Sequence, residues 1–220
     1  DYCNFKKNPT DPKAIILKTK EEILADLKEG EKYGCKEAMF AFGEDADEEE
    51  IVKIKLKEYG YDRMIDYIVE VCQMTLDETT LLPHTNGGNF SYDDLKRLKE
   101  VNASMGLMLE NSSKRLMELP AHNKSPGKNP DLRIETIENA GKLKIPYTTG
   151  ILIGIGETKE EIADSLLTIR DIYDKYGHIQ EVIIQNFTPI PGIEMEHWAE
   201  PSFLDMVRAV IAGTWVFKDT

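Results

Sequence analysis

The sequence is poor in cysteine and has no long apolar run. Its 220 residues include three cysteines, and Cys3, Cys35 and Cys72 are too few and too widely spaced for a disulfide framework. No apolar stretch approaches the roughly 20 residues that a membrane-spanning helix needs, and no signal peptide is visible. We therefore expect a protein of the reducing cytoplasm with no membrane partner.

Positive charge is also in short supply. The chain has 27 Lys and Arg against 40 Asp and Glu, a formal net charge of −13. Such a charge repels a phosphate backbone, and the basic residues alternate with Glu along the expected helices rather than forming a stripe. We therefore expect no nucleic-acid partner. The length fits one domain over residues 1–220.

What the sequence does contain is a repeated pattern. Five apolar runs each end in Gly, His, Asn, Gln or Glu and then give way to a helix, at residues 38–42, 80–82, 106–109, 150–153 and 182–184. Continuous apolar runs joined by helices are typical of parallel strands covered on both faces. Polar residues at the carboxyl ends of such strands are where α/β barrels and open sheets place their active sites. The pattern predicts an α/β fold and a place to look for chemistry.

Start and stop signals define the expected helices. Thr19 with Glu22 forms a capping box, and Gly34 ends the helix that follows. The acidic run 45–50 is interpreted as a solvated helix start. Residues 83–88 and 121–130 are expected to be loops, and the latter is long enough to indicate function or mobility. The expected helices cover residues 20–33, 44–74 with an interruption near 60, 91–101, 131–143, 158–176 and 203–216.

Two glycine-containing turns follow apolar runs and are candidates for ligand binding. Gly43-Glu44 pairs backbone donors with a carboxylate, which suits a ligand ammonium group. Gly154-Ile155-Gly156-Glu157 would let the backbone approach a flat ligand at a helix N-terminus. Each turn is equally consistent with a simple strand-to-helix connection.

Two histidines fall in the expected loops at the strand ends. His84 is followed by Thr85 and Asn86, and His122 by Lys124, Ser125 and Lys128. A lone loop histidine is more often a surface residue, but these polar neighbours favour a site. We interpret His178 and His197 as structural, and Cys35 and Cys72 as small apolar core residues.

Three short elements together resemble the radical S-adenosylmethionine (radical SAM) superfamily. Asp1-Tyr2-Cys3 resembles the tail of its CxxxCxxC cluster motif. Phe42-Gly43-Glu44 is similar to its GGE element, and Gly154-Ile155-Gly156-Glu157 is similar to its GxIxGxxE element.

Longer stretches resemble one family within it, the first, cyclising subunit of 7,8-didemethyl-8-hydroxy-5-deazariboflavin (FO) synthase. The resemblance runs from Asp1 to about Pro191. Only Cys3 of three cluster cysteines is present, and the match fades beyond about Ile193. We therefore expect a fragment lacking both ends, a partial TIM-type (β/α) barrel without its first strand. The stretches are residues 35–38, 83–86, 101–110, 125–128, 145–158 and 176–187.

The resemblance implies a [4Fe–4S] cluster and S-adenosyl-L-methionine as cofactors. It implies a step of coenzyme F420 biosynthesis, in which a hydroxybenzyl–ribityluracil adduct closes to the deazaflavin FO with loss of ammonia. The second FO synthase subunit is a possible partner. The resemblance implies Cys3 as metal ligand, and it places at the cofactor Tyr2, Gly43, Glu44, Glu110, Gly154, Gly156 and Glu157. It leaves His84, His122 and Glu110 as catalytic candidates, with Thr85 and Asn86 as further substrate contacts.

Other readings stay open at this point. A paralogous radical SAM enzyme, either the adduct-forming partner subunit or a menaquinone-pathway relative, would act on another substrate. A metal-free α/β barrel would bind a phosphorylated small molecule with Ser125–Lys128 as its anion loop. A degenerate barrel would serve only as a binding partner. With one thiolate for a cluster that needs three, we expect the fragment alone to be inactive.

Overall fold

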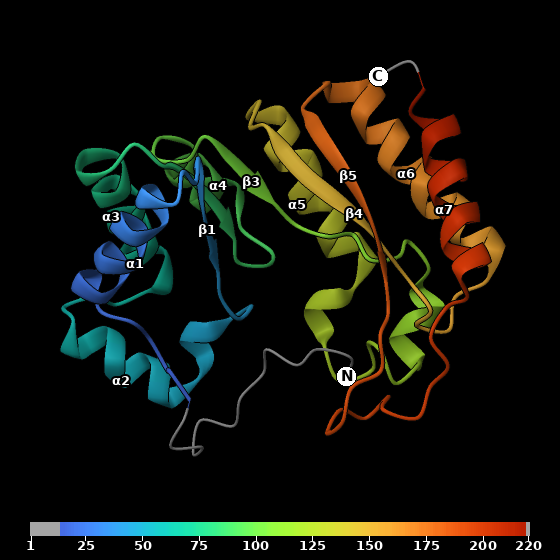
Figure 1. Cartoon of the computed structure of the whole chain (residues 1–220), viewed down its shortest axis with the longest axis horizontal. Coiled ribbons are helices and arrows are strands. Elements are labelled where there is room, and N and C mark those ends of the chain that lie inside the picture. Colours follow the sequence, from blue (N-terminus) through green and yellow to red (C-terminus); the bar gives the residue numbers. More distant parts are fainter. Residues whose placement is uncertain (1–13, 219–220) are drawn as a thin grey trace. The chain divides into compact units, whose positions relative to one another are not determined.

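The computed structural model describes residues 14–218, and the chain divides into two compact units (Figure 1). The first unit runs up to Gly106, and the second contains the chain from Leu107 onward. Tyr2 and Cys3 lie outside the described residues. The expectation of one domain remains a prediction.

Three parallel strands form the sheet of the first unit. Strand β1 (Glu37–Ala41) pairs with β2 (Leu82–Asn86), and β2 pairs with β3 (Ser104–Gly106). In the first register Ala41 lies beside Asn86, so the carboxyl ends of β1 and β2 are neighbours. The helices of this unit are α1 (Lys20–Lys32), the short 3₁₀ helix η1 (Ala46–Glu48), α2 (Glu50–Glu58), α3 (Met64–Glu78) and α4 (Tyr92–Lys99).

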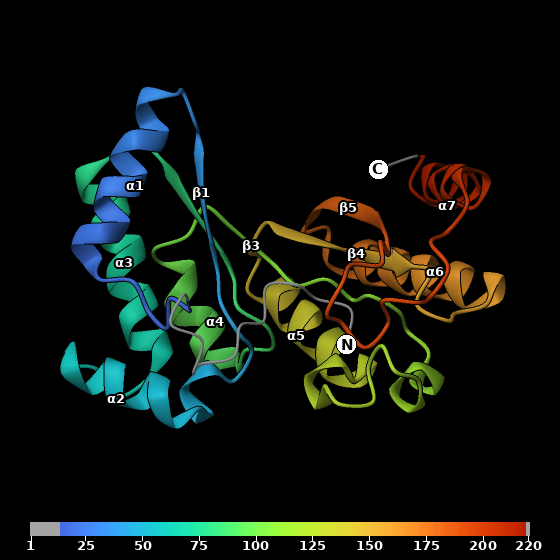
Figure 2. The same ribbon diagram turned by 60° about the horizontal axis from the view of Figure 1, so that its bottom comes forward.

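Helices α1 and α3 lie on one face of this sheet (Figure 2). Leu27, Ala38 and Leu81 form a buried cluster between them and the strands. Successive strand residues point to opposite faces, and the other face carries Met39 and Leu82, which are 61% and 51% exposed. The first unit therefore has one packed face and one face without a helical cover among the described residues.

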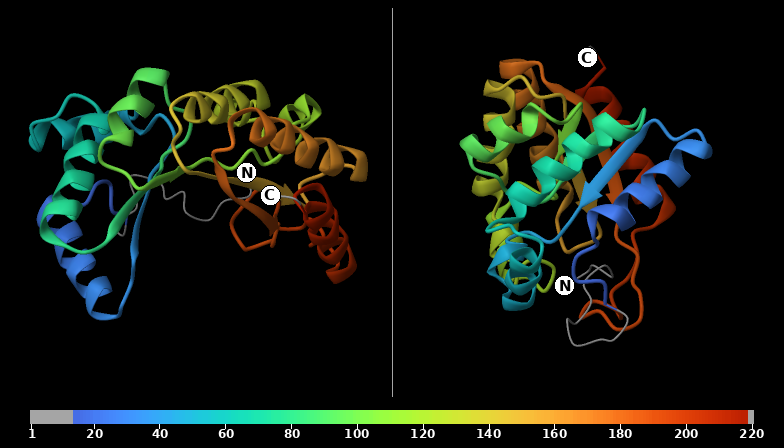
Figure 3. Two further views of the ribbon diagram at one scale, coloured as in Figure 1. Left: turned by 90° about the horizontal axis from the view of Figure 1, so that it is seen from above. Right: turned by 90° about the vertical axis from the view of Figure 1, so that its left-hand side faces the viewer.

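The second unit has two parallel strands, β4 (Tyr147–Ile153) and β5 (Ile179–Asn186), with a register shift at Tyr147 and Thr148. Every residue of β4 is buried, as expected for a parallel strand covered on both faces. Figure 3 shows α5 and α6 on one face and α7 beside β5. The helices are η2 (Lys114–Glu118), η3 (Pro126–Lys128), α5 (Pro130–Lys142), α6 (Lys159–Tyr176) and α7 (Phe203–Val216).

Local signals explain where several helices begin. Thr19 and Thr158 each form a capping box with the Glu three residues later, at the start of α1 and of α6, which satisfies backbone donors that the helix leaves unpaired. Ser91 caps α4. The expected start of each of these helices is confirmed, and α7 has the expected bounds.

Two strands lie away from their expected positions. Strand β2 covers residues 82–86, so the prediction that His84, Thr85 and Asn86 form a loop is wrong. Pro83 has no amide hydrogen to donate, and it is tolerated because it stands near the start of the strand. Its carbonyl still accepts from the Ala103 amide. Strand β3 ends at Gly106, where it was expected to begin. Residues of β2 that favour turns in isolation are held in a strand by backbone pairing with β1 and β3.

The cysteines and the apolar segments give two further results. Cys72 is buried as expected, but Cys35 is exposed, so its assignment to the core is wrong. Within residues 14–218 no helix is both long and apolar enough to cross a membrane. The α/β class with parallel strands is confirmed.

Candidate functional site

In the first unit, Glu44 lies just beyond the end of β1. Its Oε1 accepts from the Asn89 amide nitrogen at 3.0 Å and also from the Asn89 side chain. Gly88 has φ of +95°, and a Cβ there would stand 2.8 Å from Glu44 Cβ. Only glycine therefore allows the chain after β2 to pass so close to Glu44. The sequence brings a carboxylate and a glycine turn together at two neighbouring strand ends.

Gly43 is less constrained. A Cβ at Gly43 would meet Ala46 at 3.9 Å, an ordinary contact. Neither crowding nor backbone conformation in the described protein thus requires a glycine at this position.

His84 lies within β2 and is 3% exposed. Its Nδ1 is 2.7 Å from Ser104 Oγ on β3 and 3.9 Å from Glu37 Oε2 on β1. Because side chains alternate along a strand, His84 shares a face with exposed Leu82. The structure places an imidazole, a hydroxyl and a carboxylate on the face that no helix covers among the described residues of this unit.

Thr85 points to the opposite face. It is fully buried and donates to Asn102 Oδ1 at 2.8 Å, with Cys72 Sγ at 3.6 Å. Burial raises the pKa of the Cys72 thiol to about 11, so this sulfur is a neutral, unreactive member of the network. Asn86 ends the strand and is half-buried.

In the second unit, Glu110 is a buried carboxylate paired with Lys128. Its Oε1 lies 2.6 Å from Lys128 Nζ, and the side chains are 7% and 21% exposed. Glu110 has φ of +65°, a conformation that costs a non-glycine residue about 1 kcal/mol or more. The β4 backbone clamps it from both directions, because Glu110 N donates to Gly150 O and Leu152 N donates to Glu110 O. Such retained strain is typical of functional sites.

His122 and Arg133 belong to the same buried, charged region. His122 is 1% exposed, and burial together with the nearby Lys128 ammonium lowers its pKa to about 4. Arg133 is 3% exposed; its Nε donates to Gly127 O at 3.0 Å, and its Nη1 donates to Met108 O. Arg133 therefore ties η3 to the segment that leads into Glu110, while His122 stays neutral at pH 7.

The turn after β4 is closed by its own glutamate. Glu157 accepts from the amides of Gly154 at 2.7 Å and Ile155 at 2.8 Å. Gly154 and Gly156 have φ of +92° and +101°, and a Cβ on Gly154 would stand 2.3 Å from Pro201 Cγ. The glycines are required by backbone conformation and by packing, which gives the turn one fixed shape.

The structure thus gathers the expected residues into two groups, one in each unit. Cys3 and Tyr2 lie outside the described residues, and within residues 14–218 no three His, Cys, Asp or Glu side chains are grouped to hold a metal. His178 is buried, with Nε2 3.0 Å from Ile137 O, and His197 is exposed. Both fit the structural interpretation.

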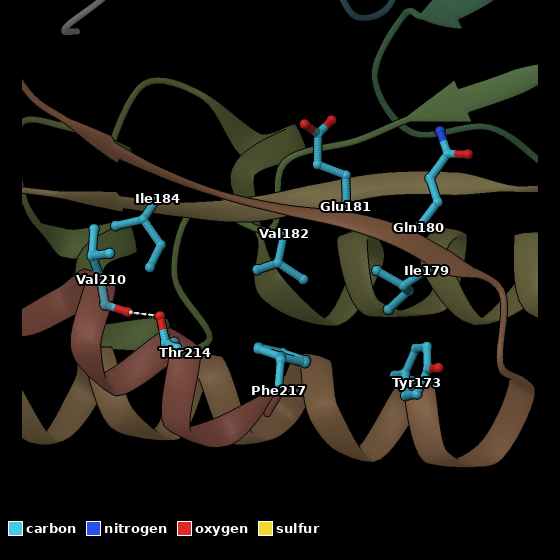
Figure 4. Close-up of a pocket in the computed structure, with 10 residues that line it drawn as sticks. Tyr173, Ile179, Gln180, Glu181, Val182, Ile184, Val210, Thr214 and Phe217 are labelled. Carbon is cyan, nitrogen blue, oxygen red and sulfur yellow. Dashed lines mark hydrogen bonds between the residues drawn. The ribbon is translucent and has the colours of Figure 1, made fainter. Parts of the chain in front are cut away.

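A cavity of about 460 Å³ lies elsewhere in the second unit, between β5 and α7 (Figure 4). Val182, Ile184, Val210 and Phe217 contribute to its wall. None of the predicted site residues lines it, and it lies along residues 179–184 of β5, from the amino-terminal end of the strand, rather than at its carboxyl end. We therefore do not assign the candidate site to this cavity.

Sequence reasoning missed several residues of these groups. Asn89, which holds Glu44, directly follows two glycines after a strand, and that position is a usable signal. Ser104 and Arg133 carry no such signal, because one lies in a short strand and the other in a helix. Lys128 was noticed as a polar neighbour of His122 and as part of an anion loop, but not as the partner of Glu110. Partners brought by pairing between strands are not visible in the local sequence.

Strand-end carboxylates, a fixed glycine turn and an α/β fold define a class of cofactor-binding enzyme domains. The model of the radical SAM superfamily matches residues 1–169, and the chain belongs to that superfamily. Its fold resembles the solved structure of HydG, a maturase of the [FeFe]-hydrogenase, with a TM-score of 0.77 and 19% identity over 96% of this chain and 45% of that one. The expected fold class is confirmed.

The relatives are more specific. The chain is 76% identical to the 7,8-didemethyl-8-hydroxy-5-deazariboflavin synthase of Methanobrevibacter smithii over 100% of its own length and 65% of that protein. It is 54% identical to the protein of the same name from Methanocaldococcus jannaschii over 99% of its length and 60% of that protein. The resemblance to FO synthases is confirmed, and the chain spans somewhat less than two thirds of these relatives.

Proposed function

We propose that this chain is the cofactor-binding part of an FO synthase. The observation that carries the proposal is 76% identity, along the whole chain, to a protein of that name. The proposed reaction closes an adduct of a hydroxybenzyl group and a ribitylaminouracil to the deazaflavin, with release of ammonia. This is a step in making coenzyme F420.

The strand-end residues fit S-adenosylmethionine in their chemistry. Glu44 is a fixed carboxylate that would accept from the ammonium group of the methionine part, and Glu110 would accept from ribose hydroxyls. The turn containing Gly154 and Gly156 would hold the adenine. Glu157 already fixes the backbone of this turn, so binding would not have to order it at a cost in entropy. When bound beside a reduced [4Fe–4S] cluster, this cofactor supplies a carbon radical that abstracts hydrogen from substrate.

The described residues contain no set of cluster ligands. Cys3 is the proposed ligand that this sequence contributes, and Tyr2 would pack beside it. The cluster needs three thiolates, and the two cysteines within residues 14–218, Cys35 and Cys72, belong to no metal-binding group.

The imidazoles have different proposed roles. His122 is neutral at pH 7 because burial and Lys128 lower its pKa to about 4, so it would orient substrate by hydrogen bonds rather than carry a proton. His84, with Ser104 at 2.7 Å, has a neighbour able to accept or donate, and is the better candidate to move a proton as ammonia leaves. Asn86 adds an amide for the uracil or the ribityl chain.

The anion-loop reading is disfavoured by one contact. The Lys128 ammonium, which would bind the phosphate, is 2.6 Å from Glu110. A phosphate there would meet a buried carboxylate, and like charges oppose binding. A cytoplasmic location and a second FO synthase subunit as partner also remain proposals; the free thiols of Cys35 and Cys72 are consistent with the first.

The test is substrate discrimination in a polypeptide that carries this sequence at the length of its relatives, reconstituted anaerobically. We expect the hydroxybenzyl adduct to give a fluorescent deazaflavin and ammonia, whereas tyrosine plus the diaminouracil should give neither. Turnover of tyrosine plus the diaminouracil would instead indicate the adduct-forming paralogue.

A further inference from the structure

Arg115, on η2, connects two parts of the second unit. Its Nη2 donates to the carbonyl oxygen of Gly156 at 2.7 Å. Its Nε and Nη2 also donate to the two carboxylate oxygens of Glu161, at 2.9 and 2.7 Å. One guanidinium therefore binds the glycine turn and the first turn of α6 together, in the bidentate geometry that only arginine offers.

Glu161 is the centre of this network. Besides Arg115, it accepts from Ser113 Oγ at 2.7 Å and from the Thr158 amide at 2.7 Å. The Arg115 guanidinium and these donors lower the pKa of Glu161 to about 2, although partial burial opposes them. The Glu161 side chain is 15% exposed, and it stays ionised throughout the neutral range.

The same network reaches the segment that follows Glu110. Asn111 Oδ1 accepts from the Ser113 amide at 2.8 Å, and the Ser112 amide donates to Ser165 Oγ on α6 at 2.9 Å. The chain leaving Glu110 is thus bonded to the same helix that the glycine turn opens. The two segments proposed to contact the adenosyl group share one anchor.

We propose that Arg115 is a positioning residue for the adenosyl cofactor, fixing the Gly154–Glu157 turn and the segment after Glu110 through its bonds to Gly156 and Glu161. The inference rests on the proposed function. It goes beyond helix capping, because Thr158 and Glu161 already form a complete capping box without Arg115. The bond to the Gly156 carbonyl contributes nothing to the cap, and it acts on the turn alone.

The experiment measures binding of S-adenosylhomocysteine by calorimetry, in a polypeptide of the relatives' length that carries this sequence. Arg115→Gln should weaken binding about tenfold, the equivalent of one charged hydrogen bond. The affinity of Arg115→Lys should fall between those of the parent protein and Arg115→Gln, since an ammonium can meet Glu161 or Gly156 but not both in the same geometry. Arg208→Gln is the matched control: Arg208 pairs with Asp205 on α7, so binding should be unchanged.

Amide hydrogen exchange supplies a readout that a general stability effect would not move. In Arg115→Gln, exchange should accelerate at residues 154–157 while β4 stays as protected as in the parent protein. Parent-like affinity in Arg115→Gln would overturn the inference and leave the proposed function standing. So would faster exchange spread evenly over the unit. Absence of S-adenosylhomocysteine binding in the parent protein would overturn both.

Discussion

The ion pair between Lys128 and Glu110 allows the most quantitative prediction. Replacing Lys128 by Met removes the ammonium and leaves the Glu110 carboxylate, which is 7% exposed, in a low-dielectric site. Breaking a buried pair from one side typically costs 3–5 kcal/mol. Because Lys128 retains 21% exposure, we expect about 3 kcal/mol, equivalent to about 6–12 °C in Tm for a chain of this size.

The reverse substitution should cost less. Glu110→Gln leaves the partly exposed Lys128 ammonium able to reach water, so we expect about 1–2 kcal/mol. The double variant should then be less destabilised than the sum of the two, with a coupling energy of about 1–3 kcal/mol. This asymmetry between the single variants follows from which partner is buried more deeply.

The assay is urea unfolding followed by tryptophan fluorescence. The chain has two tryptophans, Trp198 and Trp215, and both lie in the second unit with Glu110. Lys124→Met is the control, because its pair with Glu194 is exposed and exposed ion pairs contribute little to stability. A Lys128→Met variant within 0.5 kcal/mol of the parent, the scatter typical of surface substitutions, would refute the reasoning.

Three further predictions concern other contacts. His122 has its pKa lowered to about 4, so its stabilising contribution is fully present above pH 6.5 and is lost as the pH falls toward 4. His122→Asn should remove about 3 kcal/mol of this pH dependence of the free energy of unfolding, measured by urea titration at several pH values. The same pH dependence in the variant and the parent protein would contradict this prediction. Gly154→Ala places a Cβ 2.3 Å from Pro201 Cγ at a φ of +92° and should destabilise by about 2–3 kcal/mol in the same fluorescence assay, with a parent-like midpoint counting against the packing argument. Thr19→Ala breaks the capping box of α1 and should cost about 1 kcal/mol, seen as faster amide exchange confined to α1; unchanged exchange would show that the cap is dispensable.

The fold was largely predictable because its signals are local. Capping residues marked the starts of α1, α4 and α6, and the apolar run 150–153 fell within the carboxyl half of β4. The error at β2 has a physical cause. Pro83, Asn86 and Gly87 favour a turn by themselves, but pairing with β1 and β3 satisfies the backbone and overrides that preference.

The candidate site was predictable only at its strand ends. Glu44 and the glycine turn stand just beyond the ends of β1 and β4, and Glu110 directly follows the apolar run 106–109, so these positions follow from the apolar pattern. The pairing of these carboxylates was not predictable, since Asn89 and Lys128 lie 45 and 18 positions away in sequence. The glycines before Asn89 mark a turn, but which carboxylate each partner meets depends on how the strands are paired and how the chain folds back.

The central claim is that an adenosyl cofactor bound by this chain reacts with the hydroxybenzyl adduct. The most direct measurement is mass spectrometry of the 5′-deoxyadenosine formed when adduct deuterated on its hydroxybenzyl and ribitylaminouracil carbons is supplied to the reconstituted polypeptide of the relatives' length. The account predicts deuterium in the 5′-deoxyadenosine together with deazaflavin in the product. Deazaflavin with wholly unlabelled 5′-deoxyadenosine, or none at all, would contradict it.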